Sequence, residues 1–190
     1  MGVGGRLAFS YALGTFPTAL IVARLAGHDP TAEGSGNPGA SNVYRLAGPG
    51  AGAAVFAGDA AKGAVAAAAG RAAGGPSLAM ACGLAAVVGH VFPAFRRFRG
   101  GRGVATAAGV VTVLEPILAL PFAALWMTLA RVTGRASVAS VAVVGGIPAA
   151  VVVLGRPRWE RVGMAALAAL VLARHGGNLV RLARGEEPTL

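Results

Sequence analysis

Six apolar segments, each nearly free of charged residues, dominate this sequence of 190 residues. Most are long enough for one membrane span, since about 20 residues of α-helix cross the hydrocarbon core of a bilayer. The shortest, at 162–173, is extended if Arg161 and Arg174 reach outward from its ends. The pattern predicts an all-α membrane protein. The six segments are Leu7–Ala23, Leu46–Gly70, Pro76–Phe95, Gly103–Ala130, Ala136–Gly155 and Val162–Ala173.

The composition supports this class. Hydrophobic residues make up 55% of the chain and charged residues 13%, and the mean hydropathy is +0.66. The net charge is +10, but the basic residues stand at the ends of apolar segments. That placement favours membrane topology and contact with lipid headgroups over nucleic-acid binding. The single cysteine, Cys82, excludes a disulfide framework within the chain.

The segment Gly103–Ala130 is too long for one upright span, because 28 helical residues reach ~42 Å. Glu115 and Pro116 lie near its middle. Proline interrupts helical hydrogen bonding, and an ionised glutamate is costly inside the bilayer. We therefore expect a tight turn at this position, with a short helix on each side.

The arginine distribution favours this split. With two helices, eleven arginines fall on one face of the membrane and five on the other, whereas one helix gives nine and seven. The positive-inside rule then predicts seven spans, with the N-terminus outside and the C-terminus in the cytoplasm. Residues 1–190 are expected to form a single integral-membrane domain. Three polar segments, 34–45, 89–106 and 174–187, fall together on the cytoplasmic face.

The first polar segment, 34–45, is rich in glycine, serine and asparagine. Its backbone N–H groups can converge on an anion, and its side chains add hydroxyl, amide and guanidinium donors. An ordinary helix-connecting turn would have a similar composition, so both interpretations stay open. The candidate binding residues are Ser35, Gly36, Asn37, Asn42 and Arg45.

The second polar segment, 89–106, ends in glycines that precede a predicted helix. Free N–H groups and the positive end of the helix dipole favour an anion there. Arg96, Arg97 and Arg99 are better explained by topology and lipid contact, whereas Arg102 stands among the glycines. The candidate phosphate-binding residues are Gly100, Gly101, Arg102, Gly103 and Thr106.

The third polar segment, 174–187, carries His175, Asn178 and Arg181 at a spacing of three, which is one helix face. A charged tail after the last span is the alternative. A further pair, Asp59 and Lys62, lies three residues apart inside an apolar segment. Ionised groups at such depth normally pair, so we interpret them mainly as a structural ion pair.

Several motifs in order resemble the acyl-phosphate:glycerol-3-phosphate acyltransferase family (PlsY) over nearly the whole chain. Gly14-Thr15-Phe16-Pro17 is similar to the family's GS-x-P, and SGNPGASN to SGNPGATN. Asp59-Ala60-Ala61-Lys62-Gly63 is similar to D-x-x-K-G, and GHVFPAFRRFRGGRGVAT to GHxFPxFxxFxGGKGVAT. The segment from His175 to Glu187 resembles the C-terminal motif.

The resemblance implies a seven-helix bacterial membrane enzyme with a cytoplasmic active site. Such enzymes transfer a fatty acyl group from acyl phosphate to the 1-hydroxyl of glycerol 3-phosphate, giving lysophosphatidic acid and phosphate for phospholipid synthesis. It implies no cofactor or metal, and membrane lipids as the surroundings. His175, Ser35 and Asn178 are the implied catalytic residues. Ser35, Arg45, Arg102, His175 and Asn178 would line the pocket, and the backbone of Gly100–Gly103 would hold phosphate.

Two positions depart from the family pattern. Arg102 replaces lysine, and Thr31 stands where a basic residue is usual. A catalytically silent homologue that binds anionic lipid or phosphate is therefore the alternative. A small transporter is third, because paired broken helices are not evident. The His-x4-Asp motif of another acyltransferase class is missing, and His28 and Glu33 come closest to it.

Overall fold

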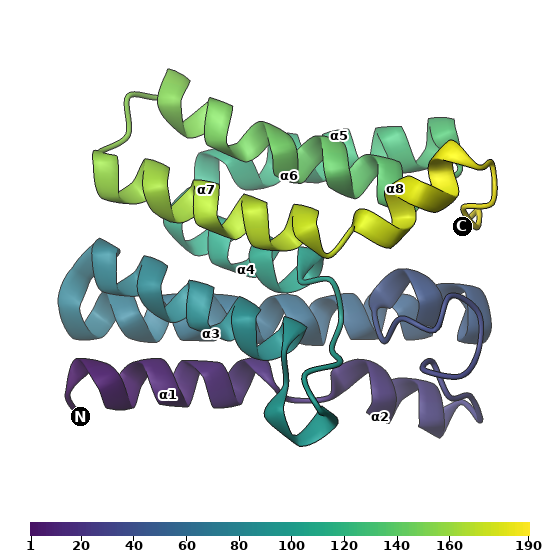
Figure 1. Ribbon diagram of the computed structural model, residues 1–190. Helices are drawn as coiled ribbons and strands as arrows, with labels where there is room; N and C mark the ends of the chain where they lie inside the picture. The colour runs from purple at the N-terminus through teal and green to yellow at the C-terminus, as the bar shows by residue number, and fades with distance from the viewer. The chain divides into compact units, whose positions relative to one another are not determined.

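The computed structural model describes all residues, 1–190, and every regular element is helical (Figure 1). The chain forms two compact units, residues 1–114 and 115–190. The first unit contains α1 (Val3–Gly14), α2 (Thr18–Leu25), α3 (Ala40–Val91), the 3₁₀ turn η1 (Ala94–Arg96) and α4 (Val104–Leu114). The second contains α5 (Pro116–Thr133), α6 (Ala136–Val153), α7 (Arg158–Ala173) and α8 (Gly176–Ala183).

The long element α3 is not one straight helix. Its backbone leaves helical geometry at Gly48, where φ is 85°, and again at Gly74 and Gly75, where Gly75 has φ 80°. Each break precedes a proline, which cannot continue the hydrogen-bond ladder. A Cβ on Gly70 would lie 2.7 Å from the carbonyl oxygen of Leu78. The chain therefore reverses at Gly74–Gly75, and the two arms of α3 run antiparallel.

Glycines allow the helices of the first unit to approach closely. A Cβ on Gly63 of α3 would lie 2.1 Å from the carbonyl oxygen of Thr106, and one on Gly109 of α4 would lie 1.9 Å from that of Ala60. Gly14 of α1 has the same relationship to Ala86 of α3. Helix association in lipid depends on such small residues, because apolar burial drives it little.

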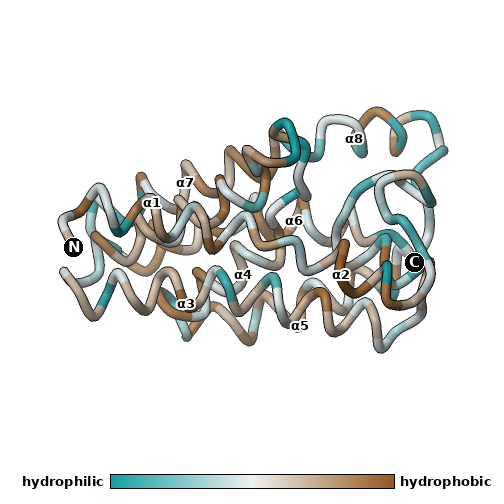
Figure 2. Tube along the Cα trace, turned by 90° about the horizontal axis from the view of Figure 1, so that it is seen from below, coloured by the Kyte–Doolittle hydropathy of each residue, from teal (hydrophilic) through white to brown (hydrophobic).

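Four helical segments are long and apolar enough to cross a membrane: residues 3–25, 40–96, 116–133 and 136–153. The pair α7 and α8, bent by 52°, makes a fifth if it is counted as one span, and α4 is apolar but shorter. Hydrophilic residues gather in the connections and toward the C-terminus, while the helices are largely apolar (Figure 2). The chain is a multi-pass membrane protein; the seven-span count, the orientation and the single domain stay predictions.

Two apolar segments contain a break in the helix. The expected interruption at Glu115 is confirmed, since α4 ends at Leu114 and α5 begins at Pro116. The first apolar segment lies within one candidate span, residues 3–25, and its helix is broken at Thr15–Pro17, between α1 and α2. Pro17 supplies no N–H to the preceding turn, and the Thr15 hydroxyl donates to the Ala12 carbonyl at 2.6 Å.

Within the second unit, Glu115 is buried and meets the loop between α6 and α7. The Nη2 atom of Arg156 donates to Oε2 of Glu115 at 2.7 Å, and Glu115 is 3% exposed. This pairing provides the buried carboxylate with an opposite charge.

Candidate active site

Asn42, in the first turn of α3, organises the first polar segment. Its Oδ1 accepts a hydrogen bond from the backbone N–H of Ser35 at 2.9 Å. Its Nδ2 donates to the carbonyl oxygens of Pro30 and Glu33, both at 3.1 Å. Asn42 is 1% exposed. Its amide therefore holds the loop in shape, a role different from the substrate contact suggested by the sequence.

The folded loop brings Ser35 and Arg45 together. Nη2 of Arg45 donates to Oγ of Ser35 at 3.5 Å, so the hydroxyl and the guanidinium face one region. Gly34 and Gly36 have φ of 58° and 68°, which non-glycine residues rarely adopt. At Gly34 a Cβ would also collide with Oδ1 of Asn42 at 2.3 Å.

Just upstream, the carboxylate of Glu33 fixes the start of the same loop. Oε1 of Glu33 accepts from the N–H of Asp29 at 2.7 Å, and Oε2 contacts Nδ1 of His28 at 2.8 Å. The hydrogen bond from the Asp29 backbone, followed by that from His28, holds the pKa of the Glu33 carboxyl below its ordinary value. His28 and Glu33 therefore have a structural explanation. Thr31 donates both its N–H and its hydroxyl to Asp29.

The second polar segment is tied back to α1 and α3. The hydroxyl of Tyr11 donates to the Phe92 carbonyl at 2.7 Å and accepts from the Ala94 N–H at 3.1 Å. Arg97 and Phe98 follow with φ of 51° and 61°. The chain then returns, because the N–H groups of Gly100 and Gly101 donate to the carbonyls of Val91 and His90 at 3.0 and 3.2 Å.

These bonds involve two of the glycines expected to bind phosphate. The N–H groups of Gly100 and Gly101 already have carbonyl partners inside the protein, and phosphate binding by these glycines stays a prediction. Glycine is needed at position 101 because there is no room for a side chain: a Cβ on Gly101 would lie 2.2 Å from Nε2 of His90. The expected helix does begin at Val104, and its first turn has N–H groups without intrahelical partners.

Thr106 in that first turn is fully buried, and its hydroxyl has no hydrogen-bond partner within the protein. Arg102 and Gly103 precede α4, with Arg102 half-buried and Gly103 at φ 87°. A buried hydroxyl and the open end of a helix dipole together suit an anionic ligand.

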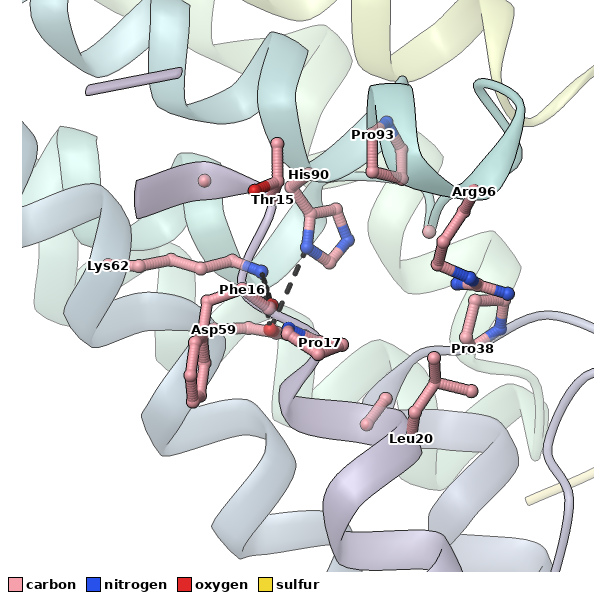
Figure 3. A pocket seen from close by; sticks show the side chains of 13 residues that line it. Thr15, Phe16, Pro17, Leu20, Pro38, Asp59, Lys62, His90, Pro93 and Arg96 are labelled. Carbon is pink, nitrogen blue, oxygen red and sulfur yellow. Dashed lines mark hydrogen bonds and ion pairs between the residues drawn. The ribbon is translucent and has the colours of Figure 1, made fainter. Parts of the chain in front are cut away.

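A small pocket of the first unit is lined by residues from both the first and the second polar segment (Figure 3). Pro38 comes from the first segment, and Pro93, Arg96 and Gly101 from the second. Asp59 and Lys62 line the same pocket with a separation of 2.9 Å, and Nδ1 of His90 lies 3.7 Å from Oδ1 of Asp59. The remaining lining includes Gly14, at the end of α1, and the break at Thr15–Pro17. Of the candidate site residues, only Gly101 lines this pocket.

Arg96 and Lys62 bring basic side chains to the pocket. The pocket is therefore a place where a cation and backbone from two polar segments converge.

The third polar segment is ordered around a carboxylate. Nδ2 of Asn178 donates to Oε1 of Glu187 at 2.5 Å, and Nε of Arg181 donates to Oε2 of the same residue at 2.9 Å. Burial raises the pKa of Glu187, but the hydrogen bond from Asn178 and the charge of Arg181 outweigh it, so the pKa lies below its ordinary value. Asn178 and Arg181 share a face of α8, as expected.

His175 stands at the N-terminal cap of α8, not inside the helix. It is 2% exposed, and its Nδ1 lies 2.8 Å from the carbonyl oxygen of Val171. A carbonyl only accepts hydrogen bonds, so Nδ1 carries a proton in this contact, which fixes the orientation of the ring.

The candidate residues thus fall into two groups. The first unit holds those of the first two polar segments, and the second unit holds His175, Asn178 and Arg181. The meeting of all three segments stays a prediction. The expected ion pair of Asp59 and Lys62 is present. The sequence analysis assigned no role to His90, which lies beside this pair, although the G-H-x-F-P pattern was an available signal. No group of three or more His, Cys, Asp or Glu side chains is arranged to hold a metal ion.

Comparisons with known proteins agree along the whole chain. The family model described as glycerol-3-phosphate acyltransferase matches residues 5–185. Glycerol-3-phosphate acyltransferase of Desulforudis audaxviator is 40% identical over 183 residues, covering 95% of this chain and 92% of that protein. The enzyme of the same name from Rubrobacter xylanophilus is 43% identical over 178 residues, covering 93% and 89%.

Two solved structures are also similar. Both are crystal structures of PlsY, an integral membrane glycerol 3-phosphate acyltransferase, at 34% identity, covering 99% of this chain and 95% of that chain. The glycerol 3-phosphate form has a TM-score of 0.94 and the lysophosphatidic acid form one of 0.91. Sequence motifs, fold and relatives therefore agree, and the chain belongs to the glycerol-3-phosphate acyltransferase family.

Proposed function

We propose that this protein transfers a fatty acyl group from acyl phosphate to the 1-hydroxyl of glycerol 3-phosphate. The products are lysophosphatidic acid and inorganic phosphate, and the reaction serves phospholipid synthesis. One observation carries the proposal: PlsY, similar over 99% of this chain, has been solved in forms with glycerol 3-phosphate and with lysophosphatidic acid. The second molecule is the first with one acyl group added, so the pair corresponds to substrate and product.

The chemistry needs positioning and positive charge more than a strong base. The glycerol oxygen forms a bond to the acyl carbon, the bond from that carbon to the phosphate oxygen breaks, and the hydroxyl proton leaves with phosphate. Phosphate is a good leaving group, so the protein's contribution is to orient two anionic reactants and stabilise the developing oxyanion. Arg45 and Arg102 supply positive charge for this, and Ser35 supplies a hydroxyl beside Arg45.

His175 and Asn178 orient the glycerol moiety in this proposal. The ring of His175, oriented by the bond from Nδ1 to the Val171 carbonyl, positions the hydroxyl that attacks. The hydrogen bond from Nδ2 of Asn178 to Glu187 fixes the orientation of the amide, whose oxygen and second N–H can bind substrate. The first turn of α4, with Thr106, favours a phosphate group.

The topology we propose has seven spans, the N-terminus outside, and the active site facing the cytoplasm of a bacterial inner membrane. The two antiparallel arms of α3 support counting that element twice. The separate helices α4 and α5 support a further span on each side of Glu115. The arginine distribution supports the orientation, since it places eleven arginines inside and five outside.

The test is an acyl-transfer assay with the purified protein in lipid nanodiscs. Palmitoyl phosphate and labelled glycerol 3-phosphate are supplied, and labelled lysophosphatidic acid and released phosphate are measured together. The parallel reaction contains palmitoyl-CoA as the only donor. We expect equal amounts of the two products with palmitoyl phosphate and none with palmitoyl-CoA. Product only from palmitoyl-CoA would refute the acyl-phosphate donor. No product from either, with glycerol 3-phosphate still bound, would favour the silent homologue.

A further inference from the structure

We infer that Asp59, Lys62 and His90 form a positioning cluster that fixes the Gly100–Gly101 turn, and through it the start of α4. The inference rests on the proposed function, because the turn leads into the helix terminus that we assign to substrate phosphate. The cluster itself does not contact substrate. It fixes the position of the backbone that binds substrate phosphate, and it therefore governs affinity for glycerol 3-phosphate.

All three side chains of the cluster are buried, and burial of charged groups has a free-energy cost. Asp59, Lys62 and His90 are 2%, 5% and 9% exposed. Removing an ion pair from water costs free energy that its mutual attraction recovers only with good geometry and further hydrogen bonds. A well-packed apolar pair would stabilise the helices equally well or better. A buried cluster of this kind is better explained by the position it imposes than by the stability it adds.

His90 connects the cluster to the glycine turn. Its ring faces Asp59, with Nδ1 3.7 Å from Oδ1, a distance of electrostatic attraction longer than a hydrogen bond (Figure 3). Its carbonyl oxygen accepts the N–H of Gly101 at 3.2 Å, and its ring occupies the space that a Cβ on Gly101 would need. The Gly101 backbone is thereby held from two sides by one residue, whose ring orientation depends on Asp59.

Lys62 connects the same cluster to the neighbouring segments. Its Nζ donates to the carbonyl oxygen of Phe16 at 3.2 Å, in the break between α1 and α2. The next residue, Gly63, packs directly against the backbone of Thr106 in the first turn of α4. The cluster thus contacts both ends of the second polar segment, 89–106. His90 lies near its start, and Gly63, next to Lys62, contacts Thr106 at its end.

The placement distinguishes a positioning role from a purely structural ion pair. Glu115 and Arg156 in the second unit form a similar pair, at 2.7 Å with Glu115 3% exposed, yet their hydrogen bond joins no glycine turn. If the Asp59–Lys62 pair only held helices together, removing it would lower stability and leave substrate binding unchanged, as is expected for the Glu115–Arg156 pair. If it positions the turn, removal of Asp59 also weakens substrate binding.

The experiment uses Asp59→Asn, which keeps side-chain volume and removes the charge, and His90→Phe, which keeps a planar ring and removes the ring nitrogens. Glu115→Gln is the matched control for loss of a buried ion pair. For each full-length protein in nanodiscs, the melting temperature, the kcat and KM for glycerol 3-phosphate, and amide hydrogen exchange of the peptide covering Gly100 and Gly101 are measured. Hydrogen exchange and melting do not depend on turnover, so they decide the positioning role even if the wild-type protein proves to lack acyl-transfer activity.

We expect Asp59→Asn and His90→Phe each to raise KM about tenfold while kcat changes less than about threefold. Exchange at Gly100 and Gly101 should become about tenfold faster, because the bonds to Val91 and His90 open more often. The double variant should show little more than the larger single effect, since both residues act through one contact. Glu115→Gln should lower the melting temperature with KM and exchange unchanged. Unchanged exchange in Asp59→Asn and His90→Phe, or a KM increase no larger than that of the control, would overturn the inference.

Discussion

Asn42 accepts a hydrogen bond at Oδ1 from the backbone N–H of Ser35, seven residues earlier, at 2.9 Å. The same side chain donates to the carbonyls of Pro30 and Glu33. One buried amide therefore satisfies three backbone groups of an otherwise irregular loop. The position of the Ser35 hydroxyl depends on it.

Substitution of Asn42 by alanine is expected to loosen this loop. The loss of three hydrogen bonds, with buried backbone groups left unpaired, should destabilise the protein by about 1–3 kcal/mol. KM for glycerol 3-phosphate should rise, because Ser35 and Arg45 lose their fixed geometry. Melting curves and steady-state kinetics measure the two effects. Asn42→Asp keeps an acceptor for Ser35 but turns a buried carboxylate oxygen toward the carbonyls of Pro30 and Glu33, so it should be at least as destabilising as alanine. An alanine variant with unaltered kinetics would show that Asn42 does not position Ser35 and Arg45.

Replacement of His175 by alanine tests its proposed role in orienting the hydroxyl. Loss of a side chain positioned at the reacting group typically lowers kcat by about 10²-fold or more. Arg184→Ala, which removes an exposed arginine at the end of α8, serves as the control and should retain activity. Turnover and glycerol 3-phosphate affinity are measured for both. If His175→Ala changes neither quantity, His175 does not orient the hydroxyl.

Stability should depend on the protonation of Glu187. Its folded-state pKa lies below the ordinary value of 4.5, so the unfolded chain takes up a proton at higher pH than the folded one. The stabilising contribution is therefore fully present above the unfolded value and is lost as pH falls through the folded pKa. Melting temperatures measured from neutral pH to below pH 4.5 should decline more steeply for the wild type than for Glu187→Gln. Parallel pH profiles would show that Glu187 does not contribute.

Gly63→Ala should disrupt the contact between α3 and α4. The added Cβ would meet the Thr106 carbonyl oxygen at 2.1 Å, and neither backbone is free to move without separating the helices. Overpacking of this kind typically costs about 1–3 kcal/mol. Gly145→Ala in α6 is the control, because a Cβ there meets nothing within 4 Å; it should preserve or raise the melting temperature. Equal melting temperatures for the two variants would argue against close α3–α4 packing.

The pair Glu115 and Arg156 is suited to a double-mutant cycle. Arg156→Ala leaves a buried carboxylate without its hydrogen bond, so we expect a lower melting temperature, by an amount that the partial exposure of Arg156 limits. The combined variant Arg156→Ala with Glu115→Gln should be less destabilised than the sum of the single changes. Additive melting-temperature changes would mean that the two side chains do not interact in the membrane.

Helix-forming segments could be predicted from the sequence because apolar length and proline position are local properties. The break at Glu115 followed from one glutamate beside one proline. The break at Thr15–Pro17 was harder to predict, since a single proline in an apolar run is also compatible with a continuous, kinked helix. Its geometry depends on Lys62, which reaches Phe16 from 46 residues away.

Within the site, residue types could be predicted more readily than their tasks. Asn42 and Gly101 were identified as candidates, but their hydrogen bonds and contacts with Ser35 and His90 become visible only when the loops are folded. The approach of His90 to Asp59 depends on the reversal of α3 at Gly74–Gly75, and no local spacing predicts it. Glu187 follows the helix that it organises, so its two bonds could not be predicted from helix periodicity.

The hydroxyl of Tyr11 has a consequence for how the chain is made. Its two backbone partners, at Phe92 and Ala94, are translated more than 80 residues after it. At ~5–20 residues per second, the ribosome needs about 4–17 s to produce them. Throughout that interval α1 resides in the insertion machinery or the bilayer with this hydroxyl lacking its eventual neighbours. During biogenesis, α1 therefore docks against α3 only after both arms of α3 have been synthesised.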